Sequence, residues 1–377
     1  MNKTLRIIGI VCLVCALLAT IGIYTYVLWP VRLALVDVQH GVSTNTNLAL
    51  SHLPDLADAY RTGDSMVFPI GLFNGALPII NMHVGESGSK AAAIIDTASE
   101  MLLLGDSERC TSCSTHLFGG ARGSDSTALV HKKAIIQFAS QKDHVEFRTE
   151  DMFIDGFQFQ NLRFGLVTHR ESLSNDTHVT FNVMGIGGAQ GVPHAFLNLL
   201  HAQLRPSHPR QFGFMLGETG NENVDTQGVF VMGKIPTSLL HGVSLSTRIQ
   251  LHSKPLTPYK YTTHVLSIIG HMRNHTPIPF PGIRGLMFDT GSNRSVLPKS
   301  IEPFFQHLDT LELRFANNQR LILPNNGLMY NRTPTLPLVK FSPDSAMVVI
   351  GTLALSKFMA FEFTLDPTPY IDFYVRP

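Results

Sequence analysis

The chain of 377 residues has little charge, little cysteine and a single tryptophan. Charged residues make up 15%, and 29 Lys+Arg against 28 Asp+Glu leave a formal net charge of +1. A near-neutral chain argues against nucleic acid as a partner. Four cysteines are too few for a disulfide scaffold in a chain of this length. Because 44% of the residues are hydrophobic, the chain can bury a sizeable core, while 30 Gly and 22 Pro argue against a long helical bundle.

Residues 7–29 form one apolar run of 23 residues without a formal charge, which is long enough to cross a bilayer as a helix. Lys3 and Arg6 precede the run, so residues 1–6 are expected in the cytosol and the rest of the chain outside it, in a periplasmic, lumenal or extracellular space. The length of the run and its aromatic end favour an uncleaved anchor over a removed signal peptide. We therefore expect a single-pass membrane protein.

The remaining chain changes character near residue 66. Residues 30–65 are acidic with short apolar pieces, which predicts a stalk or a short prosegment. From Met66 onward, short β-rich runs alternate with turn residues, which predicts a mostly-β body. Two helices are expected, at residues 193–204 and 353–361.

The body carries the same pair of motifs twice. An apolar strand ends in Asp-Thr-x-Ser at Asp96 and again at Asp289, 193 positions later. Further on, each half has an apolar pair followed by glycine, at Gly185 and Gly351. A repeat of this length predicts two similar lobes, residues 66–235 and 236–377, that place the two aspartates on matching loops facing one another.

Paired carboxyl groups within hydrogen-bond reach share one proton and act together as base and acid. The ionised group can take a proton from a water molecule that attacks a peptide carbonyl, while the protonated group polarises the carbonyl oxygen. The neighbouring residues suit this chemistry: Thr97 and Thr290 can cross to the opposite loop, Ser99 and Ser292 can donate to the carboxylates, and Gly291 lets backbone N–H groups approach.

With these motifs in this order, residues 66–377 resemble the pepsin-like aspartic proteases. The resemblance implies a mostly-β, bilobed fold and an aspartic endopeptidase with Asp96 and Asp289 as its catalytic pair. It implies Thr97, Ser99, Thr290, Gly291 and Ser292 as supporting residues, and neither a metal nor an organic cofactor. The expected partners are a peptide or protein substrate and, through residues 7–29, the membrane; we expect a monomer.

Several positions depart from the pattern of that family. The stretch AIIQFASQKDHVEF resembles the hairpin flap over the substrate, with Phe138 and Ser140 as flap residues, but Phe138 replaces the usual tyrosine and Leu103 its indole partner. Ala98 replaces the glycine of the first motif and adds a methyl group beside the carboxylates. The alternative is therefore a pseudoprotease that keeps the cleft as a peptide- or ligand-binding module.

Two of the four cysteines lie in the apolar run 7–29, and the other two, Cys110 and Cys113, stand in a C-x-x-C pair. In an oxidising space such a pair favours a small disulfide over half of a zinc site, since outside the apolar run no second C-x-x-C or matching histidine pair completes one. The stretch CTSCSTHLF also resembles the small disulfide loop of the pepsin-like family.

Overall fold

A computed structural model describes most of the body of the chain. The described residues are 60–62, 64–73, 77–85, 88–138, 141–154, 156–173, 181–187, 195–204, 209–216, 228–252, 261–273, 275–324, 339–342 and 347–375. The predicted cytosolic segment 1–6, the predicted anchor 7–29 and most of the predicted stalk 30–65 lie outside them. Within the described ranges, no helix combines the length and the apolar character needed to span a membrane.

The fold is mostly β, as predicted. The strands are β1 (Tyr60–Thr62), β2 (Ser65–Phe73), β3 (Leu77–Val84), β4 (Ser89–Asp96), β5 (Leu102–Gly105), β6 (Thr127–Gln137), β7 (Gln141–Ile154), β8 (Phe157–Ser172), β9 (Asn182–Gly185), β10 (Gln211–Met215), β11 (Gly228–Met232), β12 (Ser244–Gln250), β13 (Thr262–His264), β14 (Ser267–His271), β15 (Ile278–Phe280), β16 (Gly285–Asp289), β17 (Ser295–Pro298), β18 (Thr310–Arg314), β19 (Arg320–Pro324), β20 (Val339–Ser342), β21 (Met347–Gly351), β22 (Ala360–Thr364) and β23 (Tyr370–Val375). The helices are α3 (Thr115–Phe118), α4 (Phe196–Leu204) and α6 (Thr352–Leu355), with 3₁₀ turns η3 (Gly123–Asp125), η4 (Lys299–Ile301), η5 (Phe305–His307) and η6 (Ala316–Asn318).

Of the two predicted helices, one is confirmed and one is largely wrong. The first is α4, whose described part begins at Phe196. The second was expected over residues 353–361, but α6 ends at Leu355 and β22 begins at Ala360. Phe361 and Phe363 alternate along β22 and stack on Phe214 and Phe212 of β10, at ring centroid distances of 5.1 Å and 4.8 Å. Pairing in the sheet therefore overrides the local helical pattern.

The repeated sequence motifs lie on repeated strand arrangements. In the first four-strand unit, β4 runs parallel to β9, β9 antiparallel to β5, and β5 parallel to β8. In the second four-strand unit, β16, β21, β17 and β20 pair in the same order and directions. The registers also correspond, because Asp96 pairs with Gly185 and Asp289 with Gly351. The two Asp-Thr-x-Ser loops thus leave equivalent strands at equivalent positions.

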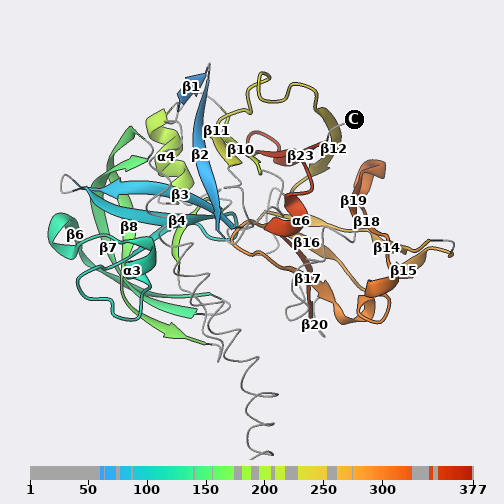
Figure 1. Cartoon of the computed structure of the whole chain (residues 1–377), viewed down its shortest axis with the longest axis horizontal. Coiled ribbons are helices and arrows are strands. Elements are labelled where there is room, and N and C mark those ends of the chain that lie inside the picture. The colour runs from blue at the N-terminus through green and yellow to red at the C-terminus, as the bar shows by residue number, and fades with distance from the viewer. Residues whose placement is uncertain are drawn as a thin grey trace, which may run out of the picture.

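One long sheet connects the beginning, middle and end of the chain. The order β23-β22-β10-β11-β2-β3-β4 brings residues 360–375 beside β10 and β11. β1, which lies within the range predicted as stalk, pairs with β2 and belongs to this sheet. In Figure 1 the strands of the first unit lie on the left and those of the second on the right, with β10, β11, β12 and β23 above their junction. The long sheet therefore contains the first unit, whereas the second unit lies in a separate sheet with the order β13-β16-β21-β17-β20.

The face of this sheet opposite the stacked phenylalanines buries a carboxyl group. Glu362 in β22 is 2% exposed, and its Oε2 accepts a hydrogen bond of 2.6 Å from the backbone N–H of Ile235. Its cross-strand neighbour is Asp372, which forms an ion pair with Arg248 at 2.7 Å. The charge of Lys234 lowers the pKa of Glu362, but less than burial raises it. Burial is the main cause that raises the pKa of Glu362 to about 7.

We predict that this carboxyl group destabilises the fold as pH rises. Because the folded-state pKa of about 7 lies above the usual value of 4.5, its contribution is complete below pH 4.5 and is lost as pH rises through 7. The loss is on the order of 3 kcal/mol. Urea unfolding at several pH values should show this slope in the wild-type chain and a flatter profile for Glu362→Gln. The control is Glu302→Gln, because Glu302 is exposed and its variant should keep the wild-type slope. If the free energy of unfolding of Glu362→Gln fell with pH as steeply as that of Glu302→Gln, Glu362 would not be the source of the slope.

Candidate functional site

The two Asp-Thr-x-Ser loops meet and exchange hydrogen bonds. The N–H of Thr97 donates to Oγ1 of Thr290 at 3.1 Å, and the N–H of Thr290 donates to Oγ1 of Thr97 at 2.9 Å. The two hydroxyls then donate across the junction, Thr97 to the carbonyl of Phe288 at 2.9 Å and Thr290 to that of Ile95 at 2.7 Å. Both threonines are 0% exposed. The loops are thus locked together immediately beside the two aspartates.

Both aspartate side chains lie against the same glycine. The N–H of Gly291 donates to Oδ1 of Asp289 at 3.0 Å. A Cβ built on the same glycine would lie 2.5 Å from Oδ1 and 2.8 Å from Oδ2 of Asp96, distances that real Cβ atoms essentially never show. The absent side chain therefore lets the two carboxyl groups come together around one backbone unit.

The first carboxyl group is held by its own loop. Oδ1 of Asp96 accepts from the N–H of Ala98 at 2.7 Å, the counterpart of the bond from Gly291 to Asp289. The hydroxyl of Ser99 donates to Oδ2 of Asp96, as its predicted role requires. Asp96 is 8% exposed and Asp289 is half-buried, so the pair lies at the edge of the solvent.

Ser292 departs from the symmetry that the motifs predict. Its hydroxyl donates to the carbonyl of Arg294 at 2.9 Å, and a hydroxyl has only one proton to donate. In the first unit the equivalent carbonyl, that of Met101, accepts from the N–H of Gly185 at 2.9 Å. In the second unit the N–H of Gly351 donates instead to Oγ of Ser295 at 3.2 Å, which leaves the carbonyl of Arg294 to Ser292.

The glycines of the apolar-apolar-Gly motifs pack directly against the backbone of the two Asp-Thr-x-Ser loops. A Cβ on Gly185 would lie 2.5 Å from the nitrogen of Met101, and one on Gly351 would lie 2.6 Å from the carbonyl carbon of Arg294. The residues that follow bind the loops: Ile186 N–H donates to the carbonyl of Asp96 at 2.9 Å, and Thr352 N–H to that of Ser292 at 2.8 Å. The spacing of these motifs is therefore explained by backbone contact.

The hairpin of β6 and β7 carries the predicted flap. Its end is closed by a hydrogen bond of 2.8 Å from the N–H of Phe138 to the carbonyl of Gln141. The half-buried side chain of Phe138 packs, with Met101 and Ile136, against an apolar cluster that contains Leu103 and Val183. Ser140 lies outside the described residues, and the role of both flap residues stays a prediction.

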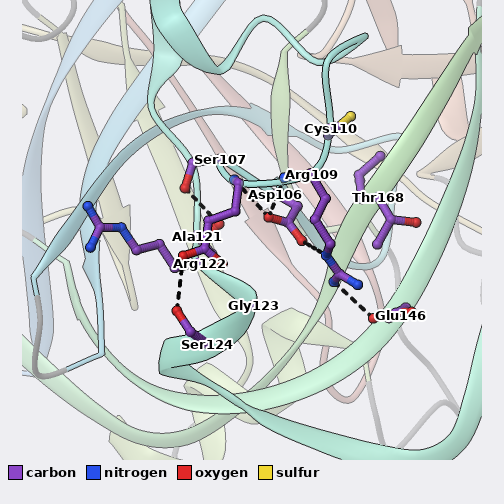
Figure 2. Close-up of polar contacts among 12 residues, drawn as sticks. Asp106, Ser107, Arg109, Cys110, Ala121, Arg122, Gly123, Ser124, Glu146 and Thr168 are labelled. Atoms are coloured by element: carbon purple, nitrogen blue, oxygen red, sulfur yellow. Dashed lines mark hydrogen bonds and ion pairs between the residues drawn. The ribbon is translucent and has the colours of Figure 1, made fainter.

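The predicted disulfide between Cys110 and Cys113 is confirmed. Figure 2 shows the turn that leads into it, where the fully buried Asp106 accepts from Nε of Arg109 at 2.5 Å. Arg109 also reaches Glu146 of β7 at 3.0 Å, and Lys133 of β6 reaches the same carboxylate at 2.9 Å. Hydrogen bonds from Lys133 and Arg109 lower the pKa of Glu146 to about 2. The disulfide turn is thus bound to the β6–β7 hairpin by ion pairs, and the low pKa of Glu146 keeps that carboxylate charged in mildly acidic solution.

One polar side chain near the site escaped the sequence analysis. Tyr261, 4% exposed, donates its phenol proton to the carbonyl of Ile186 at 2.6 Å. It belongs to no motif, so its sequence context offers no signal for this contact.

In the described ranges, no group of three or more His, Cys, Asp or Glu side chains is arranged to hold a metal ion. No family model matches the chain, and no curated protein matches it either.

Proposed function

We propose that the chain is a pepsin-like, bilobed aspartic endopeptidase in which Asp96 and Asp289 activate water. The observation that carries this proposal is the meeting of two equivalent loops. They lie 193 residues apart, interlock through Thr97 and Thr290, and bring both carboxyl groups to Gly291. If an Asp-Thr-x-Ser loop only shaped a turn, a second loop of the same composition would not be needed beside it.

The chemistry follows from two carboxyl groups that hold one proton between them. The ionised group accepts a proton from water as the water oxygen bonds to the peptide carbonyl carbon, and the protonated group donates to the carbonyl oxygen. When the C–N bond breaks, the amine leaves with a proton from the pair. The residues of the chain supply the acid and the base, so this route requires no cofactor.

The surroundings favour an extended peptide with apolar side chains as substrate. Ile136 and Phe138 of the β6–β7 hairpin and Met101, which follows the first Asp-Thr-x-Ser loop, are partly buried and pack against one apolar cluster. We further propose that residues 7–29 anchor the enzyme in a membrane and that residues 66–377 act as a monomer on the extracytoplasmic side.

A specific observation favours a second candidate, a peptide-binding module without hydrolysis. Ala98 occupies the position in the first loop that Gly291 occupies in the second, as their equivalent hydrogen bonds show. At Gly291 a Cβ would collide with the carboxyl group of the opposite aspartate. By this equivalence we infer that the methyl group of Ala98 faces Asp289 and takes part of the space that the reacting water would occupy.

Incubation of the full-length chain, purified in detergent, with a mixed peptide library between pH 3 and 7 tests the proposal. Mass spectrometry should find cleavage between apolar residues. A peptide that replaces the scissile bond with a tetrahedral secondary alcohol should inhibit strongly, because it resembles the transition state. Its epimer at the carbinol carbon is the matched control. Binding without cleavage at any pH would instead support the peptide-binding module.

A further inference from the structure

The contacts of Tyr261 with both four-strand units form a second connection beneath the paired aspartates. Its phenol donates to the carbonyl of Ile186, the residue after β9, at 2.6 Å. Its own carbonyl accepts from the N–H of Phe288, the residue before Asp289, at 3.1 Å. One residue thus joins the support of the first aspartate to the strand of the second.

These bonds close a ring with the threonine contacts. The N–H of Ile186 donates to the carbonyl of Asp96 at 2.9 Å, and the carbonyl of Phe288 accepts from Oγ1 of Thr97 at 2.9 Å. The path from Asp96 through Ile186, Tyr261, Phe288 and Thr97 therefore returns to its start. It crosses between the two units twice, once through a tyrosine hydroxyl and once through a threonine hydroxyl.

The surroundings of Tyr261 stabilise the hydrogen bond from its hydroxyl to the carbonyl of Ile186. Tyr261 is 4% exposed and packs on Phe363 and Phe212 of the long sheet, with ring centroids 4.7 Å and 5.6 Å away. Burial raises the pKa of Tyr261 well above its usual value, so the hydroxyl keeps its proton in acidic and neutral solution. A carbonyl left without this donor would be buried and unsatisfied.

We infer that Tyr261 is a positioning residue that fixes Asp96 relative to Asp289 by bridging Ile186 and Phe288. The inference rests on the proposed function for its kinetic consequence. A positioning residue acts through the geometry of the reacting groups, so its loss should lower the rate of the chemical step more than substrate binding.

Tyr261→Phe removes only the hydroxyl and is the first test. We expect kcat for peptide hydrolysis to fall about 10- to 100-fold while KM stays within about twofold. The control is Tyr374→Phe, which removes a phenol hydroxyl from a residue packed on another cluster of the same sheet. A kcat within twofold of the wild type, or a rise in KM alone, would overturn the inference.

Hydrogen exchange of the backbone amides gives a second measurement that needs no activity. The amides of Ile186 and Phe288 should exchange at least about tenfold faster in Tyr261→Phe and be unchanged in Tyr374→Phe. If the wild-type chain cleaves no peptide but these amides respond, the bridge is supported and the peptidase proposal fails. Exchange at wild-type rates in both variants would overturn the bridge itself, whatever the activity.

Discussion

Asp96→Asn and Asp289→Asn are each expected to lower kcat/KM for peptide hydrolysis by at least about a thousandfold. An amide has nearly the size of a carboxyl group but neither accepts the proton of the attacking water nor donates one to the leaving amine at these pH values. Because both roles belong to one shared proton, the double variant should lose little more than either single variant.

The measurement is the initial rate of cleavage of the best library peptide at its optimal pH. Asp309→Asn, an exposed carboxylate in the second half of the chain, should retain wild-type activity. Thermal unfolding of the two aspartate variants within a few degrees of the wild type would show that the fold is kept. Either variant retaining a tenth of the wild-type activity would place the chemistry at another site.

The sequence predicted the parts of the site that depend on backbone contact. Gly185, Gly351 and Gly291 lie where a Cβ would strike the backbone or a carboxyl group, so their places in the chain are set by geometry and recur at fixed spacing. The reciprocal threonine bonds, the bond from Ser99 to Asp96 and the disulfide between Cys110 and Cys113 follow equally from local motifs.

Other features depend on which groups the fold brings together, and the sequence does not encode them locally. Ser292 turns to the carbonyl of Arg294 only because Gly351 donates to Ser295, a residue absent from the motif. Tyr261 meets Ile186 across 75 positions of sequence. The strand at 360–364 forms because the edge of β10 pairs with it. Each of these outcomes is decided by tertiary partners, which override local patterns.

The two Asp-Thr-x-Ser loops differ at one position, and the effect of that difference can be tested. The first loop has Ala98 where the second has Gly291, yet both residues donate an N–H to the aspartate of their own loop, at 2.7 Å and 3.0 Å. The chain therefore contains its own comparison between a loop with a methyl group at this position and a loop without one.

Gly291→Ala is expected to lower kcat at least about a hundredfold, and Ala98→Gly to raise it. The new Cβ of Gly291→Ala would lie 2.5 Å from Oδ1 of Asp96, so the carboxyl group must move by about 1 Å to reach an ordinary contact, and a displacement of that size at reacting atoms costs about two orders of magnitude. Ala98→Gly removes the equivalent obstruction and leaves the N–H that binds Asp96 in place. Steady-state kinetics on one peptide measures both effects, with Ala316→Gly at an exposed turn as the control. Equal activity of the wild type and Ala98→Gly would show that the methyl group of Ala98 does not obstruct the reaction. Full activity of Gly291→Ala would contradict the close approach of Asp96 to Gly291, on which the paired-carboxylate mechanism depends.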